Sequence, residues 1–191
     1  AMRRLEELFH VEVVEYPTTR ALGASPEERA RDVNAALADP EIRALMSTIG
    51  GDDQIRILRY LDPDLPLADP KPFIGYSDNT NLHSWLFAHG LASFYGGSTM
   101  VHLGSGPTVD SEHVTSLRAA LTGTGDMTYA LPADSQDYGY DWSEERALTE
   151  ASPREAAVPF EFYGRKTRVR GRTWGGCLEV LDQLAWANRL P

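Results

Sequence analysis

Residues 73–80 constrain the fold of this chain more than any other stretch. The apolar residues Phe73 and Ile74 lead into Gly75-Tyr76-Ser77-Asp78, and a helix-like pattern follows at once, to about His89. An apolar run bounded by a glycine is typical of a short buried strand, and the apolar spacing after the turn is typical of a helix. The segment therefore predicts a strand, a tight turn and a helix in direct succession.

Strand and helix patterns alternate along the chain on both sides of this segment. We expect strands at residues 11–16, 44–49, 73–76 and 92–95, and helices at 3–9, 25–38, 54–60, 78–89 and 112–121. The helix at 25–38 has the clearest start, because Ser25, Pro26 and Glu28 form a capping box with proline at the first helical position. Alternation of this kind predicts an α/β fold with a parallel sheet flanked by helices.

The pattern changes after the last of these helices. Residues 1–122 are expected to form the α/β domain, and residues 123–158 a polar linker and active-site loop that carries Tyr138, Tyr140 and Trp142. Residues 159–191 then alternate as two strands followed by a helix at 178–190, which predicts the beginning of a second, β-containing C-terminal domain.

Composition excludes several classes of partner. A formal net charge of −10 argues against a nucleic-acid partner and against an anionic membrane surface. No apolar run approaches the roughly 20 residues that cross a bilayer, and the N-terminus has no apolar signal segment. The single cysteine, Cys177, rules out an intrachain disulfide and is typical of a reducing compartment. We therefore expect a cytoplasmic protein.

Two interpretations of Ser77 follow from the pattern. A serine on a strand-to-helix turn is the geometry of a nucleophile elbow, in which the hydroxyl is exposed and the helix N-terminus favours a developing oxyanion. The same serine is also a suitable helix N-cap. The second glycine of Gly-x-Ser-x-Gly is absent, because Asn79 occupies that position. The residues alone leave both interpretations open.

A glycine pair, Gly50-Gly51, follows the strand expected at 44–49. Sites in parallel α/β folds form outside the carboxyl ends of the strands, so this loop and the Ser77 turn are expected to line one pocket. One glycine N–H and the Asp78 N–H would then form an oxyanion hole. The simpler alternative is that the glycines only make a turn.

No general base or metal site is evident. Among the five histidines, His83 lies on the helix after Ser77 and is expected to be a packing or surface residue. Asp52 and Asp53 stand at a helix start, where carboxylates complement the dipole more often than they bind a metal. Neither a zinc-site spacing nor a phosphate-binding loop is present, so we predict no metal and no nucleotide cofactor of that type.

Four segments together resemble the LD-carboxypeptidase family of serine peptidases, and most of all its branch of microcin C self-immunity proteins. They are residues 47–53 (Ser-Thr-Ile-Gly-Gly-Asp-Asp), 71–80 (Lys-Pro-Phe-Ile-Gly-Tyr-Ser-Asp-Asn-Thr), 94–96 (Phe-Tyr-Gly) and 175–181 (Gly-Gly-Cys-Leu-Glu-Val-Leu). The resemblance covers nearly the whole chain in order. It implies a Rossmann- or flavodoxin-like N-terminal domain with Ser77 as nucleophile and Gly51 (or Gly50) and Asp78 as oxyanion donors.

The resemblance also implies a substrate class and an assembly. The carboxypeptidase branch hydrolyses the L,D-peptide bond of murein tetrapeptides, and the immunity branch hydrolyses the amide of peptidyl-nucleotides. Members use no metal or organic cofactor and are commonly homodimers. Trp142 resembles a loop tryptophan that stacks on a nucleobase in the immunity branch, although a loop tryptophan that covers the core is the alternative.

The family's catalytic glutamate and histidine would lie beyond Pro191, and its first strand and helix would precede Arg3. The resemblance therefore implies a chain truncated at both ends. It leaves two hypotheses: a serine peptidase or amidohydrolase, and a catalytically incomplete fragment or binding module that lacks the glutamate and the histidine of the triad.

Overall fold

The computed structural model describes residues 1–97, 99–123, 132–136 and 139–157. These residues form two compact units, which are treated separately. The sheet unit is residues 14–96, and the pocket unit is residues 1–13 together with the described residues from 97 to 157. The strands and helix expected within 159–191, and Cys177, lie outside the described residues.

A three-stranded parallel sheet stands at the centre of the sheet unit. Its strands are β1 (Leu45–Met46), β2 (Phe73–Gly75) and β3 (Phe94–Tyr95), in the order β1-β2-β3. Leu45 pairs with Phe73, and Ile74 pairs with Phe94. The central strand β2 is buried along its whole length, as expected for a strand flanked on both edges.

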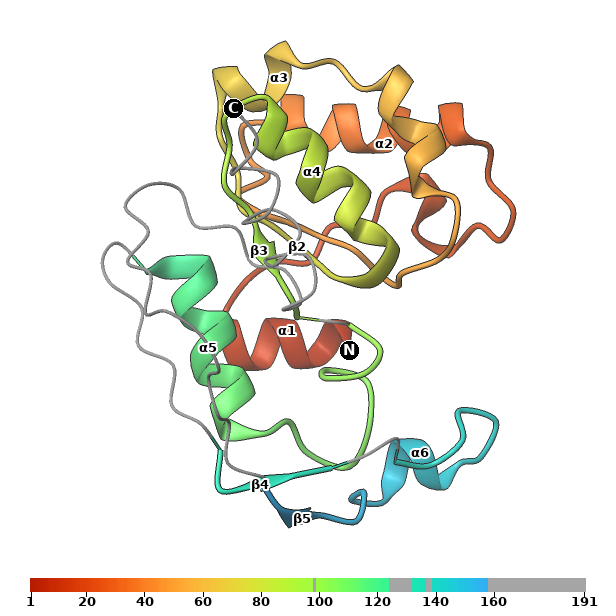
Figure 1. The fold of residues 1–191 in the computed structure, drawn as a ribbon, viewed down its shortest axis with the longest axis vertical. Helices are drawn as coiled ribbons and strands as arrows, with labels where there is room; N and C mark the ends of the chain where they lie inside the picture. The colour runs from red at the N-terminus through yellow and green to blue at the C-terminus, as the bar shows by residue number, and fades with distance from the viewer. Residues whose placement is uncertain (98, 124–131, 137–138, 158–191) are drawn as a thin grey trace, which may run out of the picture. The chain divides into compact units, whose positions relative to one another are not determined.

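Helices pack beside the strands to form the core of the sheet unit. They are η1 (Pro17–Arg20), α2 (Pro26–Ala38), η2 (Gln54–Tyr60), α3 (Asp64–Ala68), η3 (Ser77–Asn79) and α4 (Thr80–Ala88), where η marks a 3₁₀-helix. Figure 1 shows α2, α3 and α4 gathered beside β2 and β3. One core cluster joins Ala30 of α2, Ile57 of η2, Phe73 of β2 and Leu86 of α4. The predicted α/β fold with a parallel sheet flanked by helices is confirmed.

Both ends of α2 are satisfied by side chains. At its start, the predicted capping box is present: Ser25 Oγ accepts from the Glu28 N–H, and the Glu28 carboxylate accepts from the Ser25 N–H. At its end, the buried Lys71 ammonium donates to the carbonyls of Ala36 and Leu37 at 3.0 and 2.9 Å, and also to that of Asp39. A cation at a helix C-terminus complements the dipole.

The prediction of a strand at residues 11–16 is wrong. No strand is present there, and Val11 and Val14 are 41% and 52% exposed. β-branched residues favour a strand only where a neighbouring strand supplies hydrogen bonds and a surface to pack on. None of the described strands pairs with this segment.

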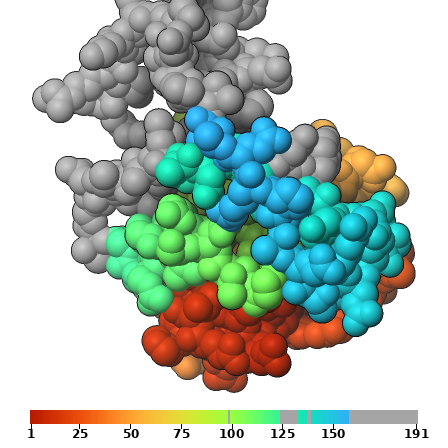
Figure 2. Space-filling view, turned by 90° about the horizontal axis from the view of Figure 1, so that it is seen from below, coloured from red at the N-terminus to blue at the C-terminus, as the bar shows by residue number. Residues whose placement is uncertain are grey.

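The pocket unit contains three helices and a two-stranded antiparallel ribbon over its described residues. These elements are α1 (Met2–Phe9), α5 (Ser111–Thr122), β4 (Asp134–Ser135), α6 (Arg146–Thr149) and β5 (Glu155–Ala156). Arg4 of α1 donates to the carbonyls of Leu103, Ser105 and Gly106 at 2.6–3.0 Å. Figure 2 shows the red N-terminal segment packed against the green segment, the part of the chain that includes residues 103–106.

The units do not follow the domain limits expected at residues 122 and 158, since residues 1–13 group with those after Gly96. Those limits stay predictions for the whole protein. Within the described ranges, no helix combines the length and the apolar character that a membrane span requires.

Candidate active site

Ser77 has a strained backbone. Tyr76 is extended, with φ −152° and ψ −175°, and Ser77 then has φ +62°, in the left-handed region. This conformation costs an L-residue roughly 1–2 kcal/mol and is uncommon outside glycine, asparagine and aspartate. The chain then enters η3 and α4 directly. A sharp strand-to-helix turn with a serine at its strained position is the geometry that exposes a nucleophilic hydroxyl.

The helix-cap interpretation of Ser77 does not match the geometry. Tyr76 precedes η3 and Asn79 precedes α4, and neither helix start has a side-chain cap hydrogen bond. Ser77 is exposed, and its carbonyl accepts from the Thr80 hydroxyl at 2.6 Å. Within the part of the chain that the structure describes, no histidine or carboxylate forms a hydrogen bond with Ser77 Oγ.

The glycine pair lies directly against this turn. A Cβ at Gly50 would stand 3.0 Å from both Cβ and Oγ of Ser77 and 3.7 Å from the Asp78 nitrogen. Gly51 has φ +146°, which strains any other residue, and a Cβ there would stand 3.4 Å from Asp78 Oδ2. The structure thus brings together Gly50, Gly51, Ser77 and Asp78. At this position, glycine is what allows two backbones to approach so closely.

The Asp78 side chain is held by hydrogen bonds with Gln54 and Asn81. Its Oδ2 accepts from the Gln54 N–H and its Oδ1 from the Asn81 amide, both at 2.8 Å. No acceptor for the Asp78 N–H is found among the described residues. A free amide at a helix start, beside a serine hydroxyl, is what an oxyanion hole requires.

His83 is a packing residue that contacts the end of β2, just before the Ser77 turn. It is 2% exposed, with Nδ1 2.6 Å from Ser93 Oγ and Nε2 2.9 Å from the Gly75 carbonyl oxygen. Burial lowers the pKa of His83, against the smaller effect of the Gly75 carbonyl. Because a carbonyl only accepts, Nε2 carries the proton and donates to Gly75. His83 therefore positions the end of β2.

Tyr95 provides a second support. Its hydroxyl oxygen accepts from the Ser77 N–H at 3.1 Å, and its ring lies 5.6 Å from that of His83, centroid to centroid. The Ser77 N–H is therefore already engaged, which leaves the Asp78 N–H as the turn's available donor.

The other expected site residues lie as follows. Asp53 forms ion pairs with Arg29 and Arg56 at 2.9 and 3.6 Å. No cluster of described His, Cys, Asp or Glu residues has the grouping that a metal ion needs. Trp142 lies in the pocket unit, just before α6, and is 49% exposed. Its stacking role stays a prediction.

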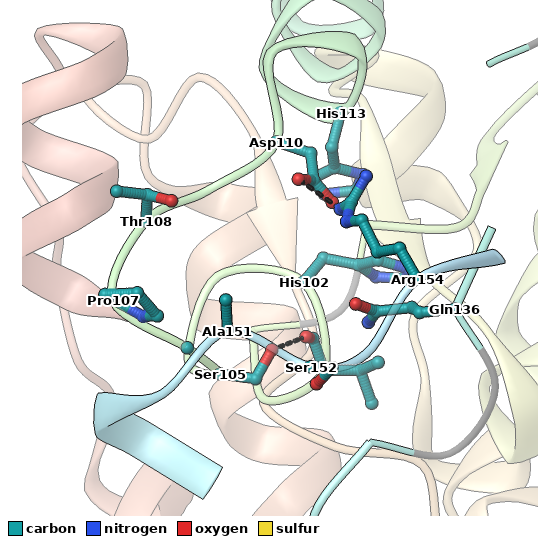
Figure 3. A pocket seen from close by; sticks show the side chains of 12 residues that line it. His102, Ser105, Pro107, Thr108, Asp110, His113, Gln136, Ala151, Ser152 and Arg154 are labelled. Atoms are coloured by element: carbon teal, nitrogen blue, oxygen red, sulfur yellow. Dashed lines mark hydrogen bonds and ion pairs between the residues drawn. The ribbon is translucent and has the colours of Figure 1, made fainter. Parts of the chain in front are cut away.

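A cavity of about 150 Å³ lies within the pocket unit. In Figure 3, His102, His113, Asp110 and Arg154 point toward it. The two imidazole rings are stacked, with centroids 4.3 Å apart and 17° between planes. Arg154 pairs with Asp110 at 2.5 Å and also with Asp134. His113 Nε2 is buried and has no hydrogen-bond partner among the described residues.

This cavity predicts a loss of stability in mild acid. Burial, and then the charge of His102, lowers the pKa of His113 from 6.5 to about 4, against the raising effect of Asp110. As the pH falls through this window, the unfolded chain binds a proton at His113 that the native chain does not bind. Stability therefore decreases with falling pH. The melting temperature of His113→Asn should fall less between pH 7 and 5 than that of the unsubstituted chain.

The matched control is His10→Asn, at an exposed histidine whose left-handed backbone (φ +55°) asparagine tolerates. This control should keep the full pH dependence. Equal pH slopes in the unsubstituted chain and in His113→Asn would contradict the prediction.

The sheet and the Ser77 turn define a class: an α/β protein that holds a serine on a strained strand-to-helix turn. Residues 1–96 match the LD-carboxypeptidase N-terminal domain, and the chain belongs to the LD-carboxypeptidase family. The family expected from the sequence is thereby confirmed.

Two curated relatives show the two branches of this family. The chain is 34% identical over 168 residues to the microcin C7 self-immunity protein MccF of Escherichia coli, covering 86% of the chain and 48% of the relative. It is 32% identical over 167 residues to the murein tetrapeptide carboxypeptidase of Pseudomonas aeruginosa, covering 87% and 47%. The chain thus spans about half the length of the curated relatives it matches.

The fold is also similar to a solved structure of MccF in complex with aspartyl sulfamoyl adenosine. The TM-score is 0.61 at 34% identity, covering 70% of this chain and 40% of the other.

Proposed function

We propose that this chain carries the nucleophile and the oxyanion hole of a serine peptidase or amidohydrolase. Ser77 attacks the carbonyl carbon of an amide, and the Asp78 and Gly51 (or Gly50) N–H groups stabilise the oxyanion that forms. The observation that carries the proposal is the positive φ of Ser77 on a strand-to-helix turn that lies against the glycine pair. Membership of a family of carboxypeptidases supports the same chemistry.

In this proposal each group has a role that its geometry supports. The Ser77 hydroxyl lies beside Gly50, and the helical segment that follows begins at this turn, where its N-terminus carries partial positive charge. Two backbone amides beside the serine are preorganised, because the glycine pair and the Asp78 side chain are both fixed by hydrogen bonds or close contact. Such donors reduce the barrier without reorganising during the reaction. A base must still take the Ser77 proton.

We propose two substrate classes, the L,D-peptide bond of murein tetrapeptides and the amide of peptidyl-nucleotides. The two branches of relatives support one class each, and the ligand of the MccF structure is an aminoacyl-nucleoside analogue. In the second class, Trp142 would stack on the nucleobase, for which its 49% exposed side chain is available. A cytoplasmic location and a homodimer belong to the same proposal.

A fluorophosphonate probe tests this proposal without knowledge of the substrate. In the product of the complete reading frame that encodes this chain, the probe should form a covalent adduct on Ser77, located by peptide mass spectrometry. Ser77→Ala should abolish the adduct. Labelling at another residue, or equal labelling of Ser77→Ala, would contradict the nucleophile assignment.

A second candidate is that the 191-residue chain is a catalytically incomplete fragment or binding module. The observation that favours it is that no described base reaches Ser77 Oγ. A serine without its partners retains only the help of binding and of the oxyanion hole. Hydrolysis of a murein tetrapeptide or a peptidyl-nucleotide amide by the 191-residue chain itself would exclude this candidate.

A further inference from the structure

We propose that Gln54 and Asn79 form a positioning clamp that fixes the glycine-pair loop (residues 49–54) in register with the Ser77 turn (residues 75–79). This inference rests on the proposed function, since it assigns the alignment of that nucleophile and its oxyanion donors to two amide side chains. Neither residue touches the reacting atoms in this role.

The Asn79 side chain contacts both the glycine-pair loop and the Ser77 turn. Its Nδ2 donates to the carbonyl of Ile49 at 3.1 Å and to the carbonyl of Tyr76 at 2.9 Å. Ile49 directly precedes Gly50, and Tyr76 directly precedes Ser77. One nitrogen atom thus links the two backbones just before the groups that must act together.

Gln54 closes the clamp from the other side. Its Nε2 donates to Asn79 Oδ1 at 2.5 Å, and its Oε1 accepts from the Leu82 N–H at 2.9 Å. Its own N–H donates to Asp78 Oδ2 at 2.8 Å. Leu82 is in the first turn of α4, where N–H groups have no partner within the helix. Gln54 therefore ties the glycine-pair loop to the helix start.

The burial of Asn79 makes this arrangement strict. Asn79 is 3% exposed, so water cannot replace a hydrogen-bond partner that its amide loses. A buried polar side chain of this kind tolerates one arrangement of partners, because any other leaves a donor or an acceptor unsatisfied. The turn and the loop are consequently held at one separation, the separation that Gly50 needs to fit against Ser77.

Two substitutions test the clamp in the product of the complete reading frame, Asn79→Ala and Gln54→Met. Each should lower kcat for a murein tetrapeptide or a peptidyl-nucleotide amide by about 10- to 100-fold, because small misplacements of catalytic groups cost about that much. KM should change little, since substrate contacts are left intact. The second-order rate of fluorophosphonate labelling at Ser77 should fall with kcat. The double variant should be less impaired than the product of the two single effects, because both remove one network.

Asn34→Ala is the matched control. The Asn34 amide donates to the Tyr60 carbonyl at 2.9 Å and accepts from the Asp62 N–H at 3.1 Å, without contact to either loop. It should lose a similar amount of stability and keep the unsubstituted kcat and labelling rate.

The outcomes separate the two levels of the proposal. No Ser77-dependent labelling or turnover in the unsubstituted protein would overturn the proposed function, and the clamp with it. Ser77-dependent activity that persists at the unsubstituted kcat in a folded Asn79→Ala or Gln54→Met protein would overturn the clamp alone. If Asn79→Ala does not fold, Gln54→Met decides, because it leaves both carbonyl contacts of Asn79 in place.

Discussion

Ser77→Ala in the complete protein is expected to lower kcat about a thousandfold or more, with little change in KM. Removal of a nucleophilic serine leaves only the catalysis that substrate binding and the oxyanion hole provide, and losses of about 10⁶-fold are known for such residues. The measurement is steady-state hydrolysis of a murein tetrapeptide and of a peptidyl-nucleotide amide by both proteins.

Ser77→Gly is an informative companion to this variant. Glycine adopts a left-handed backbone without the cost of about 1–2 kcal/mol that an L-residue bears at φ +62°. Ser77→Gly should therefore be inactive yet more stable than both the unsubstituted protein and Ser77→Ala. Hydrolysis by either variant at the unsubstituted rate would exclude Ser77 as the nucleophile, and a destabilised Ser77→Gly would contradict the strain.

Lys71→Met is expected to lower the free energy of unfolding by about 2–4 kcal/mol. The ammonium group donates to three carbonyls at the end of α2, and its side chain is fully buried. Methionine fills similar space but donates nothing, so these carbonyls stay buried and unpaired, at roughly 1–3 kcal/mol for each acceptor that finds no water. Urea unfolding followed by tryptophan fluorescence measures the loss.

Arg43→Met separates this effect from a simple ion pair. Arg43 and Lys71 both approach Asp69 Oδ2, at 3.9 and 3.4 Å, but the Arg43 side chain is 74% exposed. Exposed pairs contribute about 0–1 kcal/mol, so this variant should unfold nearly as the unsubstituted chain does. Equal losses in the two variants would show that Asp69, and not the capping of α2, is the source of the stability.

Much of the sheet unit could be predicted because its signals are local. The capping box at Ser25, and the apolar run that ends at Gly75, each depend on residues a few positions apart, and both structures are present. Pro63, Pro66 and Pro70 predict a loop where the structure has the helix α3. Proline is tolerated in the first turn of a helix, where no N–H is needed, and Pro66 is the third residue of α3.

The partners within the candidate site could not be predicted in the same way. In the sequence, Asn79 is only a departure from Gly-x-Ser-x-Gly, yet its buried amide contacts the loop 30 positions earlier. Gln54, Tyr95 and His83 also act across the fold, through hydrogen bonds that no spacing rule indicates. Polar side chains beside a glycine-rich turn were the available signal, but their partners depend on tertiary packing.

The bonds between the glycine-pair loop and the Ser77 turn all form within one continuous stretch of chain. They join residues only 24 to 30 positions apart, and each lies within residues 14–96. The entropy cost of closing a loop rises only slowly with its length, and none of these bonds needs a residue that follows Gly96. We therefore expect the serine and its amide donors to be aligned during synthesis on the ribosome, before the residues that follow Gly96 have taken their places.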